Sequence, residues 1–251
     1  MASKNEEGHA INLANFGFLL TDISLMAAGF SPSKPNLKLT ALQTLQTNAK
    51  TAHDALLVAE ANERIAMIAR KDAFQPLDPL LRRINYAVKA SSTSVEFDNS
   101  IQTIFRDLLG IRVSKRLTAE EKAAAKAAGV EKKQNSSSHL QIENRINNFD
   151  RLIKQLTPVA AYAPNEADLK IVALTAKLND LKQKQAAFIA CKKATENARE
   201  TRNIVFYADN TGLVAVANDC KMYIKSLKGI SSTLFKIVSK YKFVNFLRRK
   251  K

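Results

Sequence analysis

The chain has 251 residues, of which 46% are hydrophobic and 25% charged, as expected for a globular protein that buries a core. Only 7 glycines and 6 prolines interrupt it, which favours long helices over many short strands, and two cysteines exclude a disulfide framework. The formal net charge of +16 is the unusual value, and it points to an anionic partner.

The first predicted element is a helix through Phe16, Leu19, Ile23 and Met26, whose spacing places them on one helical face. The residues before it include Glu6 and Glu7 and no long apolar run, so no signal peptide is predicted. Apolar stretches elsewhere stop short of the roughly 18 residues that span a bilayer. We therefore expect a soluble, cytoplasmic protein.

A turn at Phe30–Pro35 precedes a long helix that is predicted to run from an N-cap at Asn36 to about Asp72. Its apolar stripe is Leu39, Leu42, Leu45, Ala49, Ala52 and Leu56. The two prolines in Phe74–Pro79 end this helix. Two shorter helices follow, separated by a loop at Ser91–Ser94. The first has the apolar residues Leu81, Ile84 and Val88. The second has Phe97, Ile101, Ile104 and Leu108 and ends at Gly110.

The next segment has the composition of a linker. Thr118–Glu121 matches a capping box and opens an Ala/Lys-rich run with almost no large apolar residue, which predicts a short exposed helix. Gln134–Ser138 is polar and is predicted to be a flexible connection.

The remaining sequence repeats the plan of the first part. A helix through Ile142, Ile146, Phe149, Ile153 and Leu156 leads to a turn at Pro158–Pro164. Asp168 is the predicted cap of a second long helix, which ends near Phe206. After a turn at Asp209–Gly212, a third helix runs to Gly229, and Ser231–Ser232 caps a final helix. The apolar stripe of the long helix is Ile171, Leu174, Leu178, Leu181 and Phe188. The next helix has Leu213, Val216, Cys220, Tyr223 and Leu227, and the final helix has Leu234, Phe235, Ile237 and Val238.

The two parts of the chain also match directly at an offset of 132 residues, with ten identities in the 45 ungapped positions from Phe30 to Phe74. Examples are Pro32 with Pro164 and Arg70 with Arg202. We interpret this match as a tandem duplication. The predicted fold is all-α: an antiparallel bundle unit of about four helices, duplicated, with repeats at 1–112 and 139–251 and an Ala/Lys-rich linker at 113–138. The pattern leaves open whether each repeat forms its own bundle or the two share an interface.

Residue patterns for catalysis are absent from the sequence. Its three histidines, His9, His53 and His139, do not occur in the spacings that bind metals in helices, and there is no glycine-rich phosphate loop. Acidic residues do not gather on an inward helical face. We therefore predict a protein that is not an enzyme and that needs no cofactor or metal.

The positive charge lies mostly toward the C-terminus: residues 1–112 hold 12 basic and 11 acidic side chains, whereas residues 141–251 hold 21 and 9. Lys170, Lys177 and Lys184 are seven residues apart and share a helical face. Near the C-terminus, basic side chains alternate with Phe235, Tyr241, Phe243 and Phe246; these basic residues are Lys236, Lys240, Lys242, Arg248, Arg249, Lys250 and Lys251. Lysine and arginine neutralise phosphates, and aromatic rings stack on unpaired bases.

The leading hypothesis is a non-catalytic protein that binds DNA or RNA with low sequence specificity, through these ten basic residues. The alternative is a structural or assembly protein whose duplicated bundles are protein interfaces, with homo-oligomers among them, and whose basic tail lies on an acidic protein surface. A separate possibility for the tail is that its aromatic residues pack on the bundle and leave only the last four basic residues free. A membrane-surface role is the weakest of the three hypotheses.

Overall fold

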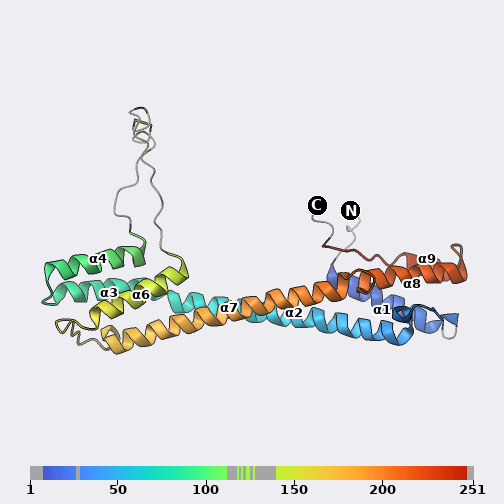
Figure 1. The fold of residues 1–251 in the computed structure, drawn as a ribbon, viewed down its shortest axis with the longest axis horizontal. Coiled ribbons are helices and arrows are strands. Elements are labelled where there is room, and N and C mark those ends of the chain that lie inside the picture. The colour runs from blue at the N-terminus through green and yellow to red at the C-terminus, as the bar shows by residue number, and fades with distance from the viewer. Residues whose placement is uncertain are drawn as a thin grey trace, which may run out of the picture. The chain divides into compact units, whose positions relative to one another are not determined.

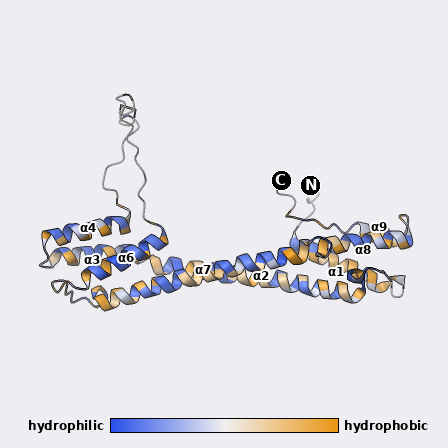
Figure 2. Ribbon diagram, viewed as in Figure 1, coloured by the Kyte–Doolittle hydropathy of each residue, from blue (hydrophilic) through white to orange (hydrophobic). Residues whose placement is uncertain are grey.

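The computed structural model describes residues 8–26, 29–111, 118, 120, 123–124, 127 and 140–247. The predicted all-α class is confirmed, since the elements assigned within these residues are α-helices and two short 3-10 helices (Figure 1). Hydrophobic and hydrophilic residues are interspersed along the helices, as expected where each helix buries one face (Figure 2). Most of the predicted linker, including Glu121 and Gln134–Ser138, lies outside the described residues.

The chain forms two compact units. Unit 1 comprises Met1–Arg64 and Ala190–Lys251, and unit 2 comprises Ile65–Ile189. Unit 1 contains α1 (His9–Leu25), α8 (Leu213–Lys228) and α9 (Thr233–Ser239). Unit 2 contains α3 (Leu77–Ala90), α4 (Val95–Leu109) and α6 (Ile142–Leu156). Each unit also contains part of the two long helices, α2 (Leu39–Phe74) and α7 (Ile171–Tyr207), so each takes helices from both halves of the sequence.

The two long helices start differently from the prediction. A 3-10 helix, η2 (Pro35–Leu37), precedes α2, and η3 (Ala167–Leu169) precedes α7. Asn36 and Asp168 lie inside these 3-10 turns, so the predicted N-caps at both positions are wrong. Asn36 instead donates its side-chain Nδ2 to the carbonyl of Asn210 at 3.0 Å, and Asp168 forms an ion pair with Arg83 of α3. Both side chains therefore connect different elements of their own unit.

Polar contacts join α2 to α7 within each unit. In unit 1 the buried Thr195 hydroxyl donates to the carbonyl of Ala59 at 3.2 Å, and Arg199 forms a 3.2 Å ion pair with Glu60. In unit 2 the Arg70 guanidinium lies 3.7 Å above the centre of the Phe188 ring and donates to Gln185 at 3.1 Å. The two long helices therefore lie side by side in both units.

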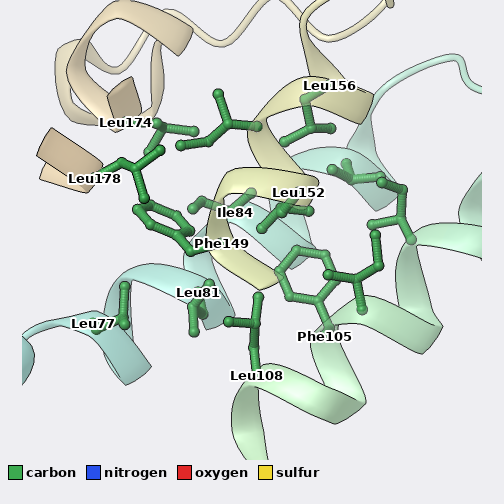
Figure 3. Close-up of a cluster of buried hydrophobic side chains, with 14 of the residues drawn as sticks. Leu77, Leu81, Ile84, Phe105, Leu108, Phe149, Leu152, Leu156, Leu174 and Leu178 are labelled. Carbon is green, nitrogen blue, oxygen red and sulfur yellow. The ribbon is translucent and has the colours of Figure 1, made fainter. Parts of the chain in front are cut away.

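The core of unit 2 is centred on α6. Phe149 and Leu152 are fully buried and lie between side chains of α3, α4 and the first turns of α7 (Figure 3). The labelled partners in this view are Leu77, Leu81, Ile84, Phe105, Leu108, Leu174 and Leu178. The predicted helices through Leu81–Val88, Phe97–Leu108 and Ile142–Leu156 are confirmed with their apolar faces inward. Ser94 caps α4, whose C-cap Gly110 has the left-handed φ of 66° that glycine adopts without strain.

The core of unit 1 packs α1 against α8. Phe16, Leu19 and Ile23 of α1 are buried, as are Val216 and Cys220 of α8. Ser232 caps α9 by accepting a hydrogen bond from the backbone nitrogen of Phe235 at 3.2 Å, as the sequence predicts. Among the described residues, no helix is long and apolar enough to cross a membrane.

Candidate polyanion-binding surface

Residues 241–247, named here the strap, follow α9 and return alongside α8 and α1 (Figure 1). The strap is held by polar side chains of α1. Asn12 Nδ2 donates to the carbonyl of Val244 at 2.9 Å, and Asn12 Oδ1 accepts from the Val244 nitrogen at 3.1 Å. Asn15 Nδ2 donates to the carbonyl of Lys242 at 2.9 Å. These bonds satisfy extended backbone that has no strand partner, so the strap belongs to the unit 1 fold.

The aromatic side chains of the strap lie against unit 1. The Phe246 ring is 5.3 Å from the His9 ring and 6.4 Å from the Tyr207 ring, centre to centre. Tyr241 stacks on Phe18 at 6.0 Å and donates its hydroxyl to Asp22 at 2.8 Å. These rings are partly buried against the core and are not free to stack on bases. Their arrangement matches the sequence alternative in which the tail aromatics pack on the bundle.

Burial against the strap changes the titration of neighbouring groups. Desolvation, with repulsion from Arg202 and then His53, lowers the pKa of His9 to about 4, so His9 is neutral near pH 7. Desolvation raises the pKa of Tyr207 to about 12. Desolvation also lowers the pKa of Lys221, whose ammonium donates to the carbonyl of Tyr241 and lies 5.3 Å from the centre of the Phe243 ring. The contact surface beneath the strap is thus partly dehydrated.

Lysine side chains occupy the outer side of the same region. Residues 213–247 hold six lysines and one acidic residue, Asp219, whose carboxylate forms an ion pair with Lys34 of unit 1. Five of the six lysines are exposed, and none of the five forms an ion pair with a carboxylate among the described residues: Lys225, Lys228, Lys236, Lys240 and Lys242. We call these five residues the lysine set.

The lysine set lies on packed elements. Helices α8 and α9 contact each other, and Lys225 Nζ lies 5.9 Å from the centre of the Phe235 ring on α9. Lys221 joins α8 to the strap, as described above. The corresponding stretch of unit 2, residues 77–109, holds four basic and four acidic residues. The α8, α9 and strap region of unit 1 therefore carries an excess of positive charge that the α3 and α4 region of unit 2 lacks.

The described binding residues predicted from the sequence belong to two different units. Lys236, Lys240 and Lys242 belong to unit 1 and are exposed. Lys170, Lys177 and Lys184 belong to unit 2, where Lys177 is half-buried and lies 3.4 Å from Asp180. Arg248, Arg249, Lys250 and Lys251 lie outside the described residues.

Sequence reasoning missed Lys225, which lies beside Phe235 of α9, and the exposed Lys228 in the last turn of α8. A signal was present: with Lys221 they follow the spacing i, i+4, i+7 on α8, which predicts one helical face. The alternation of aromatic and basic residues drew attention to the tail alone. Among the described residues, no cluster of three or more histidine, cysteine or acidic side chains could hold a metal ion.

Comparison with known proteins gives no relative: no protein-family model, curated protein or solved structure matches the chain.

Proposed function

We propose that the protein binds nucleic acid without catalysing a reaction, and that the lysine set of unit 1 makes the phosphate contacts. The observation that carries this proposal is the absence of carboxylate partners for five exposed lysines on packed elements within the described structure. Lysines paired with carboxylates must break those pairs to bind phosphate, whereas these lysines need only release water and counterions. The exposed Lys170 and the half-buried Lys177 and Lys184 are proposed as secondary contacts.

Because the tail aromatics are partly buried against unit 1, we expect contacts to the phosphate backbone of the nucleic acid rather than to its bases. Phosphate contacts position a nucleic acid but carry no sequence information, so binding is weakly specific. It is also steeply dependent on salt, because each neutralised phosphate releases counterions.

The test is binding to a 20-base-pair duplex across a series of salt concentrations, measured by fluorescence anisotropy. If the five lysines each contact one phosphate, the plot of log affinity against log salt falls with a slope of about 4.5 from this set alone. A variant with Lys228→Gln, Lys236→Gln, Lys240→Gln and Lys242→Gln should lose about 3 to 4 of that slope. Lys225 is left unchanged because it lies beside Phe235.

The matched control replaces four lysines that are ion-paired, namely Lys34, Lys154, Lys182 and Lys193. This control changes the net charge of the chain by the same amount, so a general charge effect reduces binding equally in both variants. The proposal fails if the two variants bind alike, or if the unaltered protein does not bind at low salt.

We also infer that the chain arose by tandem duplication, with repeats at 1–112 and 139–251 joined by a linker at 113–138. The positions of the elements support this: η2 and η3 start 132 residues apart, and so do α2 and α7. Unit 1 combines α1 and the N-terminal part of α2 with the C-terminal part of α7 and with the whole of α8 and α9. Unit 2 combines α6 and the N-terminal part of α7 with the C-terminal part of α2 and with the whole of α3 and α4. Each unit thus combines the early helices of one repeat with the late helices of the other.

One observation favours the assembly hypothesis as a second function. Ile65, Met67 and Ile68, near the end of α2 in unit 2, are 65%, 45% and 49% exposed. Exposed apolar side chains that lie close together mark protein contacts more often than isolated ones do.

A further inference from the structure

Unit 2 has an apolar groove of about 600 Å³ between the end of α2 and the starts of α3 and α6. Met67, Ile68 and Phe74 of α2 line it together with Ile142 of α6. Ile68 is half exposed and Phe74 is 9% exposed, so the groove has an accessible rim and a buried floor. Concave apolar surfaces of this size bind the side chains of partner molecules.

Unit 1 shows what occupies the matching positions there. Phe74 and Gln75 correspond to Phe206 and Tyr207 at the offset of 132 residues. For the residues that precede the long helices, the offset between the repeats is 133, as the match of Phe16 with Phe149 shows. At this offset, Ile142 and Arg145 correspond to His9 and Asn12.

In unit 1 these positions hold the strap. Phe246 contacts the rings of His9 and Tyr207, and Asn12 holds both backbone groups of Val244. The surface that carries an extended aromatic segment in unit 1 thus corresponds to the groove of unit 2.

The charges of the groove differ from those of the strap site. Arg70, Lys71 and Arg145 line it, against one acidic residue, Asp78, which forms an ion pair with Arg145. Arg145 stands where unit 1 has the uncharged Asn12, and its Nε is buried without a hydrogen-bond partner among the described residues. A basic groove with an unused donor suits a segment that carries carboxylates.

We propose that this groove binds an extended, acidic segment of a partner protein, with an aromatic side chain placed against Ile142, which stands where unit 1 has His9, one of the two rings that Phe246 contacts. The aromatic anchor supplies apolar burial, and the acidic flanks pair with Arg145 and Lys71. This site is independent of the lysine set, so either proposal stands if the other fails.

Two synthetic octapeptides test the proposal with the full chain. One has the sequence of residues 240–247, and the other carries Lys240→Glu and Lys242→Glu, so that both keep the same aromatic residues. Each is labelled with a fluorophore and titrated with the protein at low salt. The acidic peptide should bind at least tenfold more tightly than the lysine peptide, an amount ordinary for charge complementarity across an interface.

Variants locate the binding. Ile68→Glu places a negative charge on the groove rim and should weaken binding of the acidic peptide at least tenfold. Val172→Glu adds the same charge on α7 of unit 2 at a side chain that is 82% exposed and outside the groove, and it should have little effect.

Three outcomes would overturn the proposal. Absence of binding by the acidic peptide up to millimolar protein shows that the groove does not accept such a segment. Equal effects of Ile68→Glu and Val172→Glu place the peptide elsewhere. Tighter binding by the lysine peptide identifies the C-terminal segment of a second copy of this chain as the occupant instead of an acidic partner.

Discussion

Asn12 and Val244, 232 positions apart in the sequence, are joined by two hydrogen bonds in which the asparagine side chain pairs with both backbone groups of the valine. Asn12 is only 2% exposed, so its amide is removed from water and depends on these partners. A single side chain thereby completes the hydrogen bonding of extended backbone at the point where the strap crosses α1. The contact explains why the strap keeps its aromatic residues on unit 1.

Asn12→Ala should therefore destabilise unit 1 and release the strap. The substitution leaves the backbone nitrogen and carbonyl of Val244 without partners, at a cost of about 1–3 kcal/mol in the free energy of unfolding. Urea denaturation measures the loss, and limited proteolysis within residues 241–247 reports release. Asn15→Ala is the control, because Asn15 makes one exposed bond to Lys242 and should cost less than about 1 kcal/mol. Equal effects of the two substitutions would show that the double bond is not what holds the strap.

A chain that ends at Val238 should be less stable than the full chain, whatever it binds. Truncation removes the contacts of Tyr241, Phe243 and Phe246 with the core, worth about 2–4 kcal/mol for partly buried rings. The variant with glutamine at Lys228, Lys236, Lys240 and Lys242 removes charge but keeps these rings, so its melting temperature should stay close to that of the unaltered chain. Calorimetry of both variants distinguishes the two effects. An unchanged melting temperature in the truncated chain would contradict the packing of the strap.

Local patterns in the sequence predict most of the helices, because the 3.6-residue period of an α-helix leaves a direct mark on residue spacing. The stripe Ile142, Ile146, Phe149, Ile153 and Leu156 predicts α6, and its bounds follow from the first and last of these residues. Ser232 as a cap and Gly110 as a C-terminal residue are likewise local signals. Asn36 and Asp168 mislead for the same reason: each has the chemistry of a cap, but the 3-10 turns shift the helix starts to Leu39 and Ile171.

Pairing between distant helices has no such local mark. Periodicity tells which face of α1 is buried, but it does not tell that Phe16 shares a core with Val216 and Cys220 of α8, which lie far along the chain. The C-terminal aromatics show the same limit. Tyr241 and Phe246 alternate with basic residues, as in a base-stacking surface, and only the contacts with Asp22 and His9 reveal that they face inward.

Stability should fall as the pH drops from 6.5 toward 4, through His9. Burial lowers the pKa of His9 from 6.5 to about 4 in the folded chain, so between these values the unfolded chain binds more protons. The contribution is fully present above pH 6.5 and is lost as the pH falls through 4. It amounts to roughly 1 kcal/mol once solvent screening of this half-buried group is allowed for.

The check is the free energy of unfolding in urea at several pH values, beside His9→Gln. Glutamine does not titrate, so the variant should show a shallower decline between pH 6.5 and 4, while carboxylates contribute equally in both proteins. Parallel curves for the two proteins would mean that His9 is protonated as readily in the folded chain as in the unfolded one.

The two cysteines should react at very different rates with a thiol reagent. Cys220 is fully buried in the unit 1 core, where burial, with a smaller effect of Asp219, raises its thiol pKa to about 12. Cys191 is half-buried on α7. Because the thiolate is the reactive form, native protein at pH 8 should show one reacting thiol, and the second should react only as unit 1 unfolds.

Single substitutions assign the two phases. Cys191→Ser should remove the fast reaction and leave the slow one, whereas Cys220→Ser should leave the fast reaction unchanged. The rate of the slow phase should rise in Asn12→Ala, because the loss of the strap contacts makes unit 1 open more often. Two fast thiols in the unaltered protein would contradict the packing of α8 against α1, since that packing is what keeps Cys220 from the reagent.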